Sequence, residues 1–120
     1  MAEYDGLITW VYCDDLETTC SFYGETLGLP LWRDAGAARI YRVEGGMIGV
    51  CRAFKDRVIE PRGSMITLLT DNVDQIYARL VQQDAAVDGP PEVLEQFGIY
   101  SFFCRDPNGY FIEVQKFLDP

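Results

Sequence analysis

Histidine is absent from this 120-residue chain. Imidazole is the commonest general base near neutral pH and a frequent ligand of zinc, iron and nickel. Its absence excludes catalytic triads built on histidine and every metal site that needs an imidazole. Any catalytic or metal-binding chemistry must therefore come from carboxylates, thiols, hydroxyls or guanidinium groups.

Long apolar runs and basic residues are also scarce. No stretch approaches the roughly 20 apolar residues of a membrane-spanning helix, and residues 1–6, MAEYDG, lack the basic and apolar regions of a signal peptide. We therefore expect a cytoplasmic protein with no membrane partner. The 10 basic residues stand against 19 acidic ones, which gives a formal charge of −9. This balance disfavours nucleic acid as a partner.

Closely spaced cysteine pairs are missing as well. Zinc sites use cysteines two to four residues apart, whereas the four cysteines here are widely separated along the chain. In a cytosolic protein we expect them to be free thiols in apolar surroundings. We accordingly expect no metal and no other cofactor.

What the chain does contain is an internal repeat, read as two copies of strand–helix–strand–strand–strand. Asp14 or Asp15 caps the first helix and Gly28 ends it. Offsets of 57 residues at the helix start and 64 at the last strand align the copies, so the second contains about seven extra residues, which we place around Gly89-Pro90-Pro91. The predicted strands are 7–13, 29–34, 38–44, 47–54, 64–70, 92–97, 99–105 and 110–117, and the predicted helices are 15–28 and 71–85.

Three segments carry a family resemblance: DLETTCSFYGETLGL at 15–29, TDNVDQIYARL at 70–80 and RDPNGYFIEV at 105–114. On these segments the chain resembles the vicinal-oxygen-chelate superfamily, which groups glyoxalases, extradiol dioxygenases, fosfomycin-resistance enzymes and bleomycin-binding proteins. The resemblance implies an α+β fold in a single domain, residues 1–120. Two βαβββ modules, 1–56 and 57–120, would form mixed sheets that curve into a partly open, barrel-like trough paired across a dimer.

The resemblance also locates four positions that hold a metal ion in metal-dependent relatives. The last-strand glutamate corresponds to Glu113, and its repeat equivalent is Gly49. The first-strand ligand, usually histidine, falls on Ile8, and its repeat equivalent is Met65. One carboxylate, one thioether and two side chains without donors do not hold a divalent ion. We expect apolar surface in place of the metal site.

Glu113 then has three interpretations. It is a structural carboxylate held by hydrogen bonds, an anchor for a cationic or hydrogen-bond-donating ligand, or a general base whose pKa is raised by apolar neighbours. All three place its side chain inside the trough.

Period-two alternation predicts the rest of the trough lining. We expect an apolar, aromatic surface with few polar groups, in which Gly49 leaves extra room for a ligand. The predicted ligand-binding residues are Ile8, Trp10, Tyr12, Trp32, Tyr41, Met47, Gly49, Met65, Tyr100, Phe102, Phe111 and Glu113, and Arg39, Cys51, Thr67, Leu69 and Gln115 join the same list as neighbours.

The leading functional hypothesis is a metal-free small-molecule binding protein similar to the bleomycin-resistance branch, which sequesters an aromatic or cationic drug in grooves of a homodimer. A second hypothesis is a lyase or isomerase that uses Glu113 with Tyr12, Tyr100 or Arg39 as a second catalytic group. A metal-dependent dioxygenase or glyoxalase is a third, and a purely structural or degenerate paralogue is a fourth.

Overall fold

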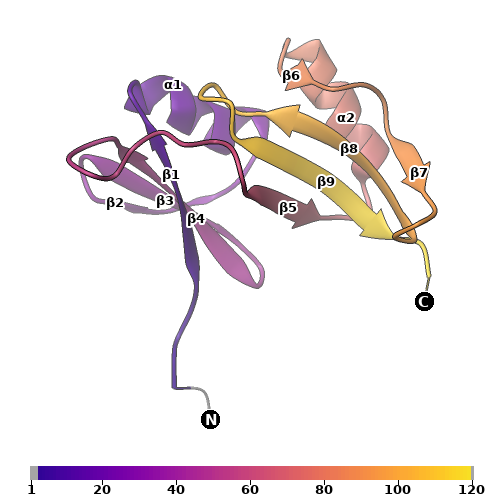
Figure 1. The fold of residues 1–120 in the computed structure, drawn as a ribbon, viewed down its shortest axis with the longest axis horizontal. Coiled ribbons are helices and arrows are strands. Elements are labelled where there is room, and N and C mark those ends of the chain that lie inside the picture. Colours follow the sequence, from indigo (N-terminus) through magenta and orange to yellow (C-terminus); the bar gives the residue numbers. More distant parts are fainter. Residues whose placement is uncertain (1–2, 120) are drawn as a thin grey trace. The chain divides into compact units, whose positions relative to one another are not determined.

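The computed structural model describes residues 3–119 and divides them into two compact units, 3–60 and 61–119, each built around its own mixed sheet (Figure 1). The expected α+β class with two βαβββ modules is confirmed, because each unit runs from a strand through a helix into a series of strands. Within residues 3–119, no helix is long and apolar enough to cross a membrane.

The first unit forms a four-stranded sheet in the order β1-β4-β3-β2. Strand β1 is parallel to β4, and the other neighbouring pairs are antiparallel. Its elements are β1 (Ile8–Cys13), helix α1 (Leu16–Ser21), the π-helix η1 (Phe22–Thr26), β2 (Leu31–Asp34), β3 (Ala38–Val43) and β4 (Gly46–Arg52).

The second unit repeats this arrangement in a sheet of order β5-β9-β8-β6, with β7 also paired to β8. Strand β5 is parallel to β9, as β1 is to β4. Its elements are β5 (Met65–Leu69), helix α2 (Val73–Gln82), β6 (Ala86–Val87), β7 (Glu92–Leu94), β8 (Ile99–Arg105) and β9 (Phe111–Phe117).

The first helix begins and ends where the sequence places its boundaries. The Asp15 side chain accepts a hydrogen bond from the backbone N–H of Thr18 at 3.1 Å, which satisfies one of the free donors of the first turn. Gly28 has a φ of 77°, the left-handed conformation that glycine adopts without strain. The sequence did not predict that the second half of this helix widens into the π-helix η1.

Strand pairing gives the same repeat offsets as the sequence. Ile8 pairs with Met47 across β1 and β4, and Met65 pairs with Phe111 across β5 and β9. The first members are 57 residues apart and the second members 64. The extra residues of the second unit form the loop between β6 and β7, two short strands that both pair with β8 where one had been expected.

Each sheet packs one face against the helix of its own unit. In the first unit Val11, Ile48 and Val50 are buried on this face together with the helical residue Leu16. In the second unit Ile112 and Val114 are buried with Leu80 of α2, which lies along β8 and β9 in Figure 1. Burying each such aliphatic side chain contributes about 1.5–3 kcal/mol to folding. We call the opposite surface of each sheet its helix-free face.

Candidate functional site

The four positions equivalent to metal ligands all lie on helix-free faces. Ile8 on β1 and Gly49 on β4 share this face in the first unit, because Ile8 and Trp10 pair with Met47 and Gly49. Met65 on β5 and Glu113 on β9 share it in the second unit. Alternation along the first and last strand of each module therefore predicts their orientation correctly.

In the first unit, the indole of Trp10 covers Gly49. A Cβ added to Gly49 would lie 2.4 Å from Cε3, 2.5 Å from Cζ3 and 2.7 Å from Cδ2 of Trp10. Three bonded ring atoms at nearly equal distances mean that the ring presents its face to Gly49, since an edge would leave two of them much farther away. The expectation that Gly49 leaves room for a ligand is therefore wrong: the room is filled by Trp10.

In the second unit, the carboxylate of Glu113 is held by two neighbours on the same face. Thr67 Oγ1 donates to Glu113 Oε1 at 3.0 Å. With its amide nitrogen turned toward the carboxylate, Gln115 donates to both carboxylate oxygens at 3.0 Å. Glu113 is only 5% exposed, so these bonds replace the water that a charged carboxylate loses on burial.

These two arrangements occupy equivalent places in the repeat. Trp10 and Thr67 are 57 residues apart and lie opposite Gly49 and Glu113, which are 64 residues apart. In each unit, the side chain facing the last-strand position across the parallel pair engages that position directly. Both positions are thus filled by the protein's own residues.

Metal-ligating side chains do not gather around this acid. Within residues 3–119, no group of three or more histidine, cysteine, aspartate or glutamate side chains is placed to hold a metal ion. The oxygen donors beside Glu113 are a hydroxyl and an amide, each already bonded to the carboxylate. Divalent cations require several free oxygen, nitrogen or sulfur donors, and this set does not supply them.

Several other predicted lining residues lie on the helix-free faces and reach solvent. Trp10 is 37% exposed, Phe111 38% and Met65 49%. Trp32 sits at an irregularity of the β2–β3 pairing, is well exposed and has the Arg33 guanidinium 5.0 Å from its ring centroid. Tyr12 and Met47 lie on the same face as Trp10 and are half-buried. Each face therefore offers large apolar side chains to a ligand.

The placement of Tyr41, Tyr100 and Phe102 in the trough wall is wrong. Tyr41 pairs with Ile48 on the helix-packed face, and its hydroxyl donates to the Cys20 carbonyl at 3.2 Å. Tyr100 and Phe102 lie on the corresponding face of β8 and contact α2. The Tyr100 hydroxyl donates to Asp74 Oδ1 at 2.5 Å, which raises the pKa of Tyr100, and the Phe102 ring packs edge-on against Tyr77.

Arg39 also lies on the helix-packed face, beside Tyr41 on β3. Its guanidinium donates to both oxygens of Glu17 on α1, at 3.2 and 2.6 Å. The hydrogen bond from Arg39 lowers the pKa of the Glu17 carboxyl below its usual range. Arg39 is therefore engaged in a surface ion pair on the side opposite Trp10.

The residues that replace these on the helix-free faces escaped the sequence reasoning. Ile40 pairs with Gly49, Phe103 pairs with Glu113, and Ser101 pairs with Gln115. The signal that finds them is hairpin geometry. A two-residue turn at Glu44-Gly45 makes Val43 face Gly46 and fixes every later pair of the hairpin, including Ile40 with Gly49.

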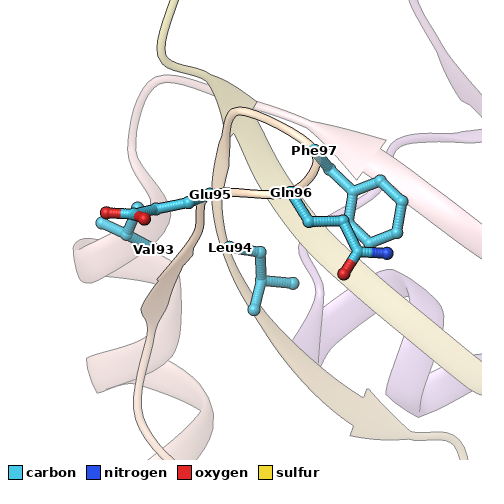
Figure 2. Close-up of a pocket in the computed structure, with 5 residues that line it drawn as sticks. All are labelled: Val93, Leu94, Glu95, Gln96 and Phe97. Atoms are coloured by element: carbon cyan, nitrogen blue, oxygen red, sulfur yellow. The ribbon is translucent and has the colours of Figure 1, made fainter.

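The surface also has a concavity of about 370 Å³ at the β7–β8 turn, away from all predicted site residues. Figure 2 shows its five lining side chains pointing in different directions around the turn. Phe97 and Val93 are largely exposed there. No polar side chains converge in it, so it carries no sign of chemistry.

Comparison with known proteins agrees with this geometry. No curated protein matches the chain. The structure of a glyoxalase/bleomycin resistance protein/dioxygenase from Nocardioides is 19% identical, with 99% of this chain and 87% of that chain covered and a TM-score of 0.77. A lactoylglutathione lyase from Agrobacterium tumefaciens is 22% identical (92% and 91% covered, TM-score 0.72), and TioX from Micromonospora sp. ML1 is 15% identical (94% and 98% covered, TM-score 0.78).

At these identities the solved structures show a shared fold alone. The family itself is shown by a sequence profile that matches residues 7–114, nearly the whole chain. This chain belongs to the Glyoxalase/Bleomycin resistance protein/Dioxygenase superfamily.

Proposed function

We propose that this chain is a metal-free binding protein that sequesters a small organic molecule in the manner of the bleomycin-resistance branch of its superfamily. The observation that carries the proposal is the state of the two last-strand positions. The Glu113 carboxylate is bonded to Thr67 and Gln115, and Gly49 lies under the Trp10 ring. Neither position offers a free donor to an ion.

The helix-free faces support binding of a flat molecule. Trp10 has one ring face against Gly49 and remains 37% exposed, so part of its indole is open to stacking. Ring stacking contributes about 0.5–1.5 kcal/mol beyond the burial of area. Trp32, Met65 and Phe111 add exposed apolar surface, as ligand sites usually do.

The same surfaces are the basis for proposing a homodimer. A βαβββ sheet has one face covered by its helix, and an apolar second face needs a partner. We propose that two chains pair and bind ligand in equivalent sites, in the cytoplasm and without nucleic acid or membrane partners. Sedimentation equilibrium tests the pairing, and a monomer at all micromolar concentrations contradicts it.

An enzymatic role has less support. The hypothesis required a second catalytic group beside the carboxylate, and two of its three candidates are engaged elsewhere: Tyr100 with Asp74 and Arg39 with Glu17. Glu113 itself is bonded to Thr67 and Gln115 rather than to an acid–base partner. No observation in residues 3–119 favours turnover over binding.

Tryptophan fluorescence tests the proposed function directly, because the chain has only two tryptophans, Trp10 and Trp32. A panel of aromatic and cationic antibiotics is titrated against the wild type and against Trp10→Phe and Trp32→Phe. We expect a bound compound to quench Trp10 and to raise the melting temperature. Tyr100→Phe, altered on the helix-packed face, serves as the control that keeps wild-type affinity. A panel that produces neither quenching nor a thermal shift counts against sequestration.

A further inference from the structure

A smaller pocket of about 140 Å³ lies on the helix-free face of the second unit. Its lining includes Asp88 and Pro90 of the β6–β7 loop, Glu92 and Leu94 of β7, and Ser101 and Phe103 of β8. Glu92 pairs with Ser101, which pairs in turn with Gln115, and Phe103 pairs with Glu113. The pocket, called here the Ser101 pocket, is thus beside the hydrogen-bonded Glu113 carboxylate.

The hydroxyl of Ser101 is buried without a partner. Ser101 is 2% exposed, and no group in residues 3–119 forms a hydrogen bond with its Oγ. An orphaned buried hydroxyl destabilises a fold, so native proteins seldom keep one without a use. A rotation about χ1 moves this small side chain between staggered positions and turns Oγ toward an occupant of the pocket.

The charges around the Ser101 pocket are unbalanced. Asp88 forms an ion pair with Arg105, and Glu113 accepts hydrogen bonds from Thr67 and Gln115. Glu92 is exposed and has no ion pair or hydrogen bond within the described residues. With Arg105 as the one basic group, the two lining carboxylates and nearby Glu113 leave the surroundings net negative. A cation is attracted to such a site, and an anion is repelled.

We propose that the Ser101 pocket binds the cationic head of the ligand, an amidinium or a primary ammonium group, through N–H donation to Ser101 Oγ and to the Glu92 carboxylate. The inference rests on the proposed binding function and names the charge of the molecule that is bound. A volume of 140 Å³ equals about four or five water molecules. That space accommodates an amidinium head, while the rest of the ligand lies on the surrounding apolar face.

Nitrogen-15 NMR of the full chain with two nearly isosteric probes tests the assignment. Benzamidine is cationic, and benzamide has the same shape without the charge. We expect benzamidine to shift the backbone amides of Glu92, Ser101 and Phe103 and to bind about tenfold more tightly than benzamide, which is the factor that one charge-assisted hydrogen bond supplies.

Three variants separate a built site from general attraction to an acidic protein. Glu92→Gln should remove the preference for benzamidine, and Glu95→Gln, a neighbouring exposed acid outside the Ser101 pocket, should keep it. Ser101→Ala should weaken benzamidine several-fold without lowering the melting temperature, because it deletes a hydroxyl that has no partner in the empty protein.

The inference is overturned if the two probes bind equally, if the shifted amides lie elsewhere, or if Glu95→Gln acts like Glu92→Gln. Its failure is distinguishable from that of the proposed function. If aromatic compounds quench Trp10 while benzamidine leaves the Ser101 pocket unchanged, the binding function stands and the cationic head does not. If neither experiment detects binding, both are wrong.

Discussion

The hydroxyl of Thr67 donates a 3.0 Å hydrogen bond to the carboxylate of Glu113 across the parallel β5–β9 pair. At the equivalent place in the first unit, the ring of Trp10 lies on Gly49 across β1 and β4. One unit fills its last-strand position with a polar contact and the other with an apolar one. In both, the neighbouring strand supplies the contact that an ion or ligand would otherwise make.

Replacing Thr67 by valine tests the polar contact. The change keeps the shape of the side chain and removes its donor, which leaves a buried carboxylate oxygen with fewer hydrogen bonds. We expect the free energy of unfolding to fall by about 1–3 kcal/mol, measured by urea denaturation. Thr9→Val, at an exposed position of β1, is the matched control and should change stability little. Equal effects of the two variants contradict the role given to Thr67.

Substituting alanine for Gly49 tests the apolar contact. The new Cβ would lie 2.4 Å from the Trp10 ring, so the indole must move. We expect a loss of about 1–3 kcal/mol, as for overpacked cores, together with a shift of the tryptophan emission. Gly46→Ala on the same strand meets no atom within 4 Å and should leave the emission unchanged. If Gly49→Ala leaves both stability and emission at wild-type values, Trp10 does not rest on Gly49.

Burial of Cys104 predicts how stability depends on pH. Burial raises the pKa of this thiol from an ordinary value of 9.0 to about 12. Between these values the unfolded chain loses the proton and the folded chain keeps it, so unfolding becomes more favourable as pH rises. Stability should therefore be unaffected by Cys104 below pH 9 and should fall above it, by at most about 1.4 kcal/mol per pH unit.

Urea denaturation of wild type and Cys104→Ala from pH 7 to 10.5 measures this dependence. The variant should lose less stability with rising pH than the wild type does. Cys51→Ala leaves Cys104 in place and should retain the wild-type slope. Parallel curves for wild type and Cys104→Ala would show that the thiol does not contribute.

The sequence predicted the outer strands of each module well and the inner ones poorly. The repeat offsets fixed which residues of β1, β4, β5 and β9 share a face, because these strands form the parallel pairs. Trp10, Met47, Met65 and Glu113 therefore lie where the alternation puts them. An error of one residue would have reversed every assignment.

For β3 and β8 the pattern was ambiguous, since aromatic residues suit either face of a sheet. Tyr41 and Phe102 satisfy a helix-packed core as well as they would line a ligand site, and only the register of the neighbouring hairpin decides between the two. The partners of Glu113 were beyond the sequence for another reason. Alternation placed Thr67 and Gln115 on its face, but side-chain rotamers determine whether they bond to the carboxylate.

The metal content of protein purified without chelators tests the central claim most directly. After incubation with manganese, iron, nickel and zinc and removal of loosely bound ions, elemental analysis of the wild type and of Glu113→Gln gives the number of ions per chain. If the last-strand positions are filled by Thr67, Gln115 and Trp10, both proteins will contain far less than one ion per chain. One tightly held ion per wild-type chain, lost in Glu113→Gln, would contradict the account.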